Sequence, residues 1–288
     1  MNPDTQRKPH WLKTQLPAGE NYTRLKHITT DNHLHTICTS GMCPNIAECW
    51  NHGTATFMIL GDTCTRSCRF CATKTAATPP KPNPQEPLHV AQAVKLMGLK
   101  HCVITSVDRD DLPDRGAQAW VDTVNQIRQL CPNTTIETLL PDFDADRNII
   151  SQFAQCQPHI AGHNLETVER LTPTVRSKAS YRRSLSTLQQ LAAHGLTTKS
   201  GIMLGLGEER QEVINTLHDL LQVGCQLVTI GQYLRPRPQN IAVSRYVPPQ
   251  EFQELKNIAL QMGFKSAESG PLVRSSYHAD QMAQAGII

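Results

Sequence analysis

Six of the ten cysteines lie between Cys38 and Cys71, at spacings that suit metal chemistry. They form two groups, Cys38, Cys43 and Cys49, then Cys64, Cys68 and Cys71. In a reducing compartment, clustered cysteines bind metal more often than they pair as disulfides. Three thiolates on a short loop, present twice, are what two iron–sulfur clusters require from a protein. The spacing therefore predicts two clusters held close together.

The second group has the pattern C-x3-C-x2-C and follows an apolar run directly. Three cysteines ligate three irons of a [4Fe–4S] cluster and leave the fourth iron open to a small bidentate ligand, such as an amino and carboxylate pair. A fourth cysteine would favour electron storage instead. A zinc knuckle is the alternative, but zinc requires two C-x2-C pairs or added histidines, and this loop has one such pair. The loop indicates chemistry at an open iron.

Six apolar runs are typical of buried strands, and amphipathic stretches alternate with them. The expected strands are 56–61, 101–107, 134–140, 158–163, 197–204 and 227–234. This alternation predicts βα units and a parallel sheet. Six strand–helix units are too few for a full eight-unit barrel, which takes about 250 residues. We therefore expect an α/β fold with a partial (β/α)6 TIM-like barrel. The alternative is an open doubly wound sheet. A further helix is expected around Phe252 and Leu255, ended by Gly263.

The chain divides into three parts that we expect to form one compact domain. Residues 1–55 read as an N-terminal arm, poor in helical periodicity, that delivers the first cysteine group. Residues 56–235 form the (β/α)6 core, and 236–288 form a C-terminal helical extension and tail. The remaining cysteines, Cys102, Cys131, Cys156 and Cys225, lie in expected strands or beside expected helices. We expect them to be buried as small hydrophobic residues.

Composition excludes several classes of protein. A hydrophobic content of 39% and a charged content of 18% are those of an ordinary folded chain. The net charge of +3 comes from interspersed residues, so we expect no nucleic-acid partner. The sequence contains no apolar run long enough to span a membrane and no apolar segment near its start that would form a secretory signal. We expect a cytoplasmic protein without a membrane partner.

Polar residues are expected at the carboxyl ends of nearly all six strands. They are Thr105, Ser106 and Asp108, Glu137, His163 and Asn164, the turn Gly205-Leu206-Gly207-Glu208, and Gln232 with Leu234. Ligands of parallel sheets bind at the carboxyl ends of the strands, so these residues are expected to face one mouth. Arg176 can pair with a ligand carboxylate through its guanidinium. The equally supported alternative is that Arg176 is an ordinary surface residue.

The second cysteine loop, placed just after the first expected strand, resembles the radical S-adenosylmethionine (SAM) superfamily. The resemblance implies that the open iron chelates SAM, and that SAM is cleaved to methionine and a 5′-deoxyadenosyl radical that abstracts hydrogen from an unactivated carbon. Phe70 matches the position whose ring lies near the adenine. The other SAM-binding residues expected by this resemblance are Thr105, Ser106, Glu137, Asn164, Arg176 and Leu234.

Both cysteine groups together make the chain resemble the lipoyl synthase family over nearly its whole length. The matching segments include GMCPNIAECW (41–50), GDTCTRSCRFC (61–71), TSVDRDDLPD (105–114), KSGIMLGLGE (199–208) and RSSY (274–277). By this resemblance the first cysteine group holds an auxiliary [4Fe–4S] cluster that is consumed as the sulfur source. A serine of RSSY completes its ligands; Ser276 is favoured, with Ser275 as the alternative.

The resemblance also implies the reaction and its partners. Two SAM molecules are cleaved in turn, and sulfur enters at C6 and C8 of an octanoyl chain that is amide-linked to a lysine, giving the lipoyl group. The carriers would be the lipoyl domains of 2-oxoacid dehydrogenase E2 subunits and the H protein of glycine cleavage. A low-potential donor such as ferredoxin or flavodoxin would supply electrons.

Two departures from the family pattern keep alternatives open. Arg115 stands in a DRGA stretch where the family more often shows DGGA, and the segment after the sixth expected strand lacks a histidine that many members carry. The alternatives are a different sulfur-inserting radical SAM enzyme (biotin synthase-like, or a methylthiotransferase), a two-cluster electron carrier, and a paralogue that binds clusters without turnover.

Overall fold

The central sheet is built from parallel strands that neighbour one another in chain order. The computed structural model describes residues 7–14, 16–32, 34–51, 55–277, 279–280 and 282–283. Within these residues the sheet has the order β1-β2-β5-β6-β7-β8-β9-β10. Its parallel members are β2 (Thr56–Ile59), β5 (His101–Ser106), β6 (Thr135–Leu139), β7 (Ile160–Gly162), β8 (Thr197–Leu204), β9 (Leu227–Gln232) and β10 (Ser266–Gly270). The first six confirm the strands expected from the sequence.

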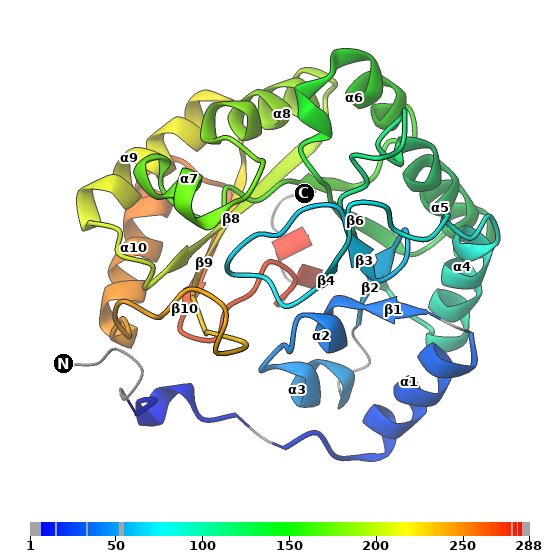
Figure 1. The fold of residues 1–288 in the computed structure, drawn as a ribbon, viewed down its shortest axis with the longest axis horizontal. Coiled ribbons are helices and arrows are strands. Elements are labelled where there is room, and N and C mark those ends of the chain that lie inside the picture. Colours follow the sequence, from blue (N-terminus) through cyan, green and yellow to red (C-terminus); the bar gives the residue numbers. More distant parts are fainter. Residues whose placement is uncertain are drawn as a thin grey trace.

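The strand order distinguishes a barrel from a doubly wound sheet. A doubly wound sheet reverses its strand order at a switch point, which places helices on both faces. Here the order never reverses, and Figure 1 shows the helices on the outside of a curved sheet. The outer helices are α4 (Glu86–Met97), α5 (Ala117–Leu130), α6 (Arg147–Ala154), α8 (Tyr181–Ala193), α9 (Arg210–Gln222) and α10 (Pro249–Met262). The prediction of a partial barrel is confirmed.

Local sequence signals account for where several helices begin and end. Ser180 caps α8 by accepting a hydrogen bond from the backbone N–H of Arg183. Glu209 and Glu212 form a capping box at the start of α9. Gly263 adopts a left-handed φ of 113° and ends α10, as expected from the sequence.

The core lies between the sheet and its helices. Trp120, Phe143 and Phe153 are among its largest buried side chains, and the rings of Trp120 and Phe153 meet edge to face with centroids 6.1 Å apart. The cysteines Cys102, Cys156 and Cys225 are buried, as expected. Cys131 is partly exposed instead, because it follows the last residue of α5 at the edge of the core.

The N-terminal arm is more regular than its sequence suggested. It contains α1 (Glu20–Asp31), the two-residue strand β1 (His35–Thr36), α2 (Ile37–Ser40) and α3 (Ile46–Asn51). The arm was expected to be poor in helical periodicity, but α1 packs Tyr22, Leu25 and Ile28 against the core at helical spacing. β1 pairs antiparallel with β2 and forms one edge of the sheet. Residues 1–6 and 52–54 of the expected arm lie outside the described residues.

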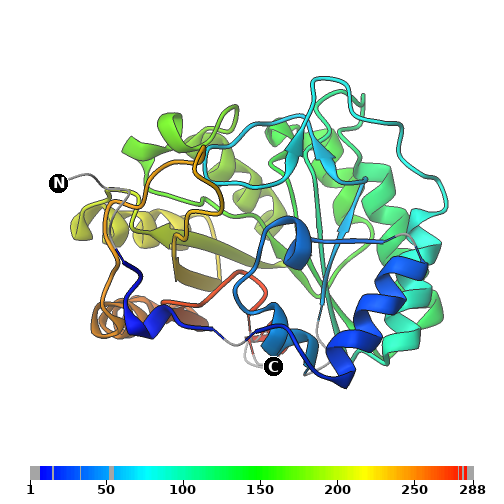
Figure 2. The same cartoon turned by 60° about the horizontal axis from the view of Figure 1, so that its bottom comes forward.

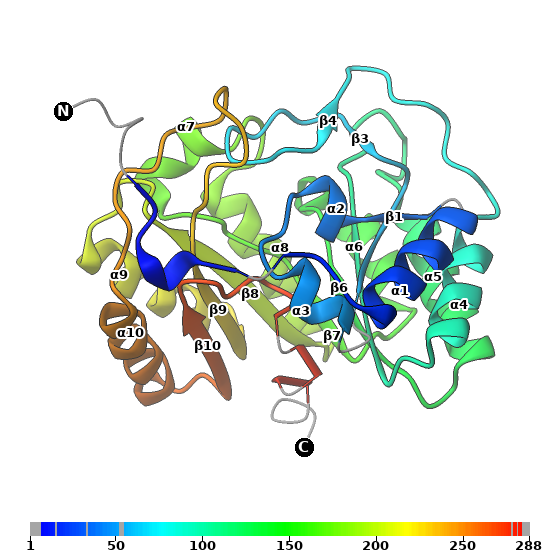
Figure 3. The same cartoon turned by 90° about the horizontal axis from the view of Figure 1, so that it is seen from below.

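The C-terminal segment closes the other edge. It adds the strand β10 beside β9, where only a helix and a tail were expected. In Figures 2 and 3 the arm and the tail lie on the same side of the molecule, between the two edge strands. The division of the chain at residues 55 and 235 stays an interpretation. Among the described helices, none is long and apolar enough to cross a membrane.

Candidate active site

The second cysteine loop lies at the carboxyl ends of the first strands. Cys64 is buried in the short strand β3 (Thr63–Cys64), which pairs with β4 (Lys74–Thr75), and Cys68 and Cys71 are partly exposed in the loop between them. Backbone N–H groups of Arg66 and Asp108 both point at Cys64 Sγ, each at 3.3 Å. N–H groups aimed at sulfur are typical of iron–sulfur ligands, because they stabilise thiolate charge.

This loop is fastened from two distant parts of the chain. Asn240, which follows β9, donates to the carbonyl oxygens of Arg69 and Cys71 at 3.0 and 2.8 Å. On the other side, the backbone N–H of Ser67 donates to Ser177 Oγ at 3.1 Å. The loop conformation is therefore set by tertiary hydrogen bonds.

Two thiols of the loop, those of Cys64 and Cys68, favour their protonated forms in the conformation described. Burial, and next the carboxylate of Asp108, raises the pKa of Cys64 to about 12. Burial also raises the pKa of Cys68, although the positive charge of Arg176 opposes the rise. Metal must displace these protons when it binds. Across the described ranges, no three His, Cys, Asp or Glu side chains converge as a preformed metal site. The donor set, three thiols with N–H groups facing Cys64, nonetheless fits a [4Fe–4S] cluster with one open iron.

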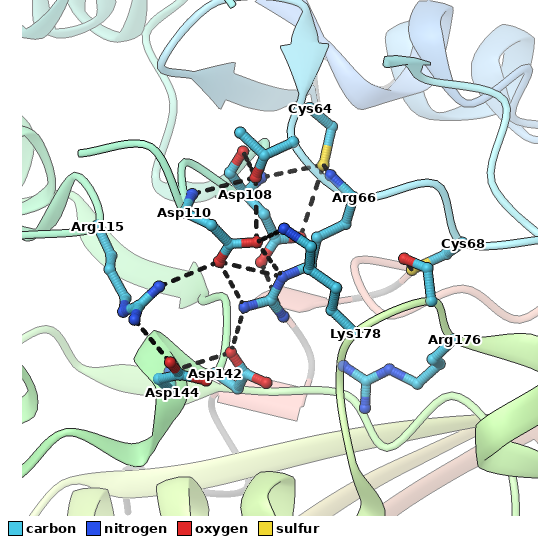
Figure 4. Close-up of polar contacts among 12 residues, drawn as sticks. Cys64, Arg66, Cys68, Asp108, Asp110, Arg115, Asp142, Asp144, Arg176 and Lys178 are labelled. Carbon is cyan, nitrogen blue, oxygen red and sulfur yellow. Dashed lines mark hydrogen bonds and ion pairs between the residues drawn. The ribbon is translucent and has the colours of Figure 1, made fainter. Parts of the chain in front are cut away.

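Arg176 is a buried residue, which excludes the surface alternative. It is 8% exposed, and its Nη1 donates to Ser184 Oγ at 2.8 Å. The Nε of Arg176 has no hydrogen-bond partner among the described residues. Figure 4 shows its guanidinium apart from the neighbouring ion pairs, below Cys68. A buried guanidinium with an unused donor is suited to an anionic ligand.

A chain of hydrogen bonds fixes the orientation of Arg176. His163 Nδ1 lies 2.8 Å from the carbonyl oxygen of Leu140 and must donate to it, so the neutral tautomer carries its proton there. Its Nε2 then accepts from Ser184 at 2.9 Å, and Ser184 Oγ accepts from Arg176. Burial, and next the charge of Arg176, lowers the pKa of His163 to about 4. At neutral pH the imidazole is therefore uncharged.

The other expected SAM-binding residues fall into two sets. Ser106, at the end of β5, has a buried hydroxyl without a partner in the described structure, and Phe70 packs against Val175, Leu206 and Tyr233. Leu234 is partly buried just beyond β9. In contrast, the hydroxyl of Thr105 donates to the carbonyl of Leu139 at 3.1 Å within the sheet.

Glu137 is not at a strand end. It lies in the middle of β6, where Lys199 Nζ contacts its Oε1 at 2.8 Å and His101 Nε2 lies 3.5 Å from its Oε2. Burial alone would raise the pKa of Glu137, but these two partners lower it below the ordinary value. The expected strand-end position is wrong, because Glu137 is the central residue both of the expected strand 134–140 and of β6.

The first cysteine group lines a cavity of about 340 Å³ with the tail. Its walls include Cys38 on α2, Cys49 on α3, Cys43 between them, and Ser276. Ser275 does not line this cavity, and its hydroxyl accepts a hydrogen bond from Asn164 Nδ2 at 2.7 Å. The structure thus brings Ser276, and not Ser275, to the three cysteines.

Two hydrogen bonds hold the tail against the first cysteine group. Asn45 Nδ2 donates to the carbonyl of Leu272 at 2.6 Å, and the hydroxyl of Tyr277 donates to Glu48 Oε1 at 3.1 Å. Asn45 and Glu48 lie in the sequence between Cys43 and Cys49. The loop that carries the cysteines therefore also positions the serine.

The electrostatics of this cavity favour an anionic group. Arg274 lines it beside Cys43, and within the described residues no carboxylate pairs with its guanidinium, whose Nη1 donates to the carbonyl of Val273. Burial lowers the pKa of Arg274, and the nearby Cys43 partly opposes this. Arg274 is only partly buried, and cysteine thiolates around iron would place negative charge beside its guanidinium. The residues present fit a cluster.

Sequence reasoning missed several residues that support these sites. Arg66 carries an ion-pair network with Asp110 and Asp142, shown in Figure 4. Trp50 is a buried indole in the same core cluster as Cys38, whose pKa burial raises to about 11. An arginine inside a cysteine loop, and the acidic run at 108–111, were signals available in the sequence. The partners could not be paired without the fold.

Arg115, the main departure from the family pattern, occupies a position that suits glycine. Its φ of 52° is in the left-handed region, and Gly116 follows with φ 83°. The side chain of Arg115 is used in ion pairs with Asp110 at 3.3 Å and Asp144 at 2.6 Å. The arginine therefore keeps a left-handed backbone of the kind that glycine favours, and its charge is compensated locally.

Comparison with known proteins agrees with this geometry. The family model described as the radical SAM superfamily matches residues 58–220, and the N-terminal domain of lipoyl synthase matches residues 1–43. Lipoyl synthases from Parabacteroides distasonis and Treponema denticola are 53% and 52% identical to this chain, each over 96% of it, and over 98% and 95% of their own lengths.

Solved structures share the fold at low sequence identity. A crystal structure of methylornithine synthase aligns with a TM-score of 0.57 and 14% identity, over 72% of this chain and 63% of its own. A structure described as native anSMEcpe with bound AdoMet aligns with a TM-score of 0.52 and 10% identity, over 73% of this chain and 62% of its own. With half of its residues identical to curated relatives along almost their full length, the chain belongs to the lipoyl synthase family of radical SAM enzymes.

Proposed function

We propose that this chain holds two [4Fe–4S] clusters with different roles. Membership of the family makes it a sulfurtransferase that uses SAM and a [4Fe–4S] cluster. In our proposal Cys64, Cys68 and Cys71 hold the cluster that cleaves SAM. The second cluster is held by Cys38, Cys43, Cys49 and Ser276, and it supplies the sulfur inserted at C6 and C8 of an octanoyl-lysine.

One observation carries the proposal for the second cluster. Three cysteines from the arm and a serine from the tail line one cavity, and Arg274, which has no carboxylate partner among the described residues, lies on its wall. A hydroxyl ligand suits a cluster that must give up sulfur, because an alkoxide binds iron less firmly than a thiolate. Ser276 is the serine proposed, since Ser275 is engaged by Asn164.

Around the SAM loop, this chain's residues bind and orient the cosubstrate. When bound, the open iron of the cluster holds the amino and carboxylate groups of SAM and supplies the electron that cleaves its sulfonium. Arg176 pairs with the SAM carboxylate through its unused Nε, held in place by His163 and Ser184. Ser106, Phe70 and Leu234 complete the contacts to SAM.

Three expected SAM contacts take different roles in this proposal. The hydroxyl of Thr105 is used in the sheet and supports the strand that carries Ser106. Asn164 orients the tail through Ser275. Glu137 forms a buried ion pair with Lys199, on the side of the barrel where His101 lines the auxiliary cavity. Their support of SAM binding is therefore indirect.

The substrate and partners follow from the same proposal. The octanoyl chain arrives on a lysine of a lipoyl carrier, such as a 2-oxoacid dehydrogenase E2 domain or the glycine cleavage H protein. A low-potential donor such as ferredoxin or flavodoxin reduces the SAM cluster, in the cytoplasm. The main catalytic contribution of the protein is to hold the octanoyl chain between the SAM cluster and the auxiliary cluster. The substrate radical must meet a sulfide of the auxiliary cluster before it is quenched.

The test is anaerobic incubation of the reconstituted protein with SAM, a low-potential reductant and an octanoyl-lysyl peptide. Mass spectrometry is expected to show a gain of two sulfurs together with 5′-deoxyadenosine. SAM cleavage without any sulfur transfer would contradict the proposal and favour a paralogue without turnover. A two-cluster electron carrier would give neither product.

A further inference from the structure

Arg66 lies inside the second cysteine loop, and its guanidinium contacts three carboxylates. Its side chain is only 4% exposed. Nε and Nη2 form a bidentate contact with Asp110 at 2.9 and 2.8 Å, Nη2 also reaches Asp142 at 2.7 Å, and Nη1 lies 3.2 Å from Asp108. Figure 4 shows this guanidinium at the centre of the polar contacts, below Cys64. All three of its nitrogens are engaged.

The surrounding network is balanced in charge. Its acids are Asp108, Asp110, Asp142 and Asp144, and its cations are Arg66, Arg115, Lys178 and Arg183. Asp110, Asp142 and Asp144 each have two or more cations. Among the described residues, Asp108 forms an ion pair with Arg66 alone. Loss of Arg66 would leave Asp108 without an ion-pair partner.

Asp108 is also the acid that contacts Cys64. Its Oδ2 lies 3.7 Å from Cys64 Sγ, and its backbone N–H points at the same sulfur at 3.3 Å. The backbone N–H of Arg66 is the second donor to this sulfur. A cysteine that ligates iron is a thiolate, so it would stand beside a carboxylate whose charge is offset by Arg66. Arg66 therefore both anchors the cysteine loop and offsets the negative charge of Asp108 beside Cys64.

We propose that Arg66 is a positioning residue that fixes Cys64 against Asp108 and raises the reduction potential of the cluster in this loop. The proposal rests on the assignment of Cys64, Cys68 and Cys71 as ligands of that cluster. The potential of an iron–sulfur cluster depends on the charge around it and on hydrogen bonds to its sulfurs. An uncompensated carboxylate near Cys64 favours the oxidised cluster, so removing Arg66 lowers the potential.

The test uses the full chain with Cys38, Cys43 and Cys49 replaced by alanine, so that a single cluster is present. In this background, Arg66→Gln removes the charge, and Arg66→Lys keeps the charge but loses the bidentate contact with Asp110. Arg183→Gln is the matched control, because it removes a cation from Asp142 and Asp144 without touching Asp108 or Cys64. The midpoint potential is measured by a redox titration followed by electron paramagnetic resonance.

We expect a more negative midpoint potential in Arg66→Gln, a smaller change in Arg66→Lys and the smallest in Arg183→Gln. Equal shifts in Arg66→Gln and Arg183→Gln, or an unchanged potential in a cluster-loaded Arg66→Gln protein, would overturn the proposal. A purely structural role would lower the melting temperature without this order of potentials. If the triple-alanine protein with Arg66 intact binds no [4Fe–4S] cluster, the assignment of Cys64, Cys68 and Cys71 as ligands is refuted instead.

If Arg66→Gln does not retain a cluster, the midpoint potential of Asp108→Asn is measured in the same background. It removes the carboxylate charge beside Cys64 and leaves Arg66 paired with Asp110 and Asp142. The midpoint potential is then expected to become more positive. A midpoint potential equal to that of the triple-alanine protein with Asp108 intact would overturn the proposal.

Discussion

Asn164 donates a hydrogen bond from Nδ2 to Ser275 Oγ at 2.7 Å, and this contact joins the end of β7 to the C-terminal tail. It leaves the neighbouring Ser276 on the wall of the cavity that holds the first cysteine group. Two adjacent serines therefore have separate roles that can be tested one at a time.

Ser276→Ala is expected to abolish sulfur insertion and to retain cleavage of SAM, because it removes the hydroxyl that we propose as a ligand of the auxiliary cluster alone. Ser275→Ala is the matched control. It loses one hydrogen bond between neutral groups, worth about 1 kcal/mol, so we expect lipoyl formation within roughly 5-fold of wild type. Product is measured by mass spectrometry of the octanoyl peptide. The reverse ranking of the two variants would assign the ligand to Ser275.

Cys38→Ala separates the two cysteine groups. We expect it to cleave SAM at a rate close to that of the unsubstituted protein and to insert no sulfur, since Cys38 lines only the auxiliary cavity. Formation of 5′-deoxyadenosine and gain of sulfur are measured in the same reaction. Loss of both activities together, in a protein that still holds one cluster, would show that the groups are not functionally separate.

Arg176→Gln tests the proposed contact to SAM. A hydrogen bond to a charged group contributes about 1.5–3 kcal/mol, so the KM for SAM is expected to rise roughly 10- to 100-fold. Arg182→Gln is the control, because Arg182 is exposed and pairs with Glu169. The KM is measured from the rate of 5′-deoxyadenosine formation. Equal KM values for the two variants would remove Arg176 from the SAM site.

Arg115→Gly examines the departure from the family pattern. Glycine adopts the left-handed conformation of residue 115 without strain, while the change removes two partly exposed ion pairs. We expect SAM cleavage to be retained and the free energy of unfolding to change by less than about 2 kcal/mol. Loss of SAM cleavage in a folded variant would mean that the guanidinium itself serves the reaction.

The buried His163 predicts a loss of stability in acid. Its folded-state pKa of about 4 is below the ordinary value of 6.5, so folding favours the neutral ring. Its contribution is complete above pH 6.5 and is lost as the pH falls toward 4, by an amount on the order of 3 kcal/mol.

His163→Gln cannot take up this proton. Although the variant is expected to be less stable at pH 7, its free energy of unfolding should fall less steeply between pH 6.5 and pH 5 than that of the unsubstituted protein. Urea unfolding at a series of pH values measures both slopes. Parallel slopes would show that the protonation of His163 is not linked to folding.

The sequence was sufficient where local pattern decides the structure. β2, β5 and β9 are buried along nearly their whole length, so their apolar runs were plain. β10 has the sequence SAESG and becomes a strand because β9 offers it a free edge. α1 has a short apolar stripe, Tyr22, Leu25 and Ile28, that packs against the core. These elements depend on neighbours distant in the chain.

The residues of the candidate sites also fall into two groups, those suggested by local spacing and those whose partners only the fold shows. The six cysteines were proposed as ligands from spacing alone, and their assignment stays a prediction. The role of Glu137 depends on Lys199 and His101, and that of Arg66 on Asp108, Asp110 and Asp142. The partners of Glu137 lie on other strands and those of Arg66 lie in other loops, and only the fold pairs them.

The most direct test of the account is the origin of the inserted sulfur. The protein is reconstituted with a heavy isotope of sulfide, freed of excess sulfide, and incubated anaerobically with SAM, reductant and octanoyl-lysyl peptide. We predict that both sulfurs of the lipoyl product carry the heavy isotope, and that Cys38→Ala yields no product. A product whose sulfur has the natural isotope composition would contradict the assignment of the auxiliary cluster as the donor.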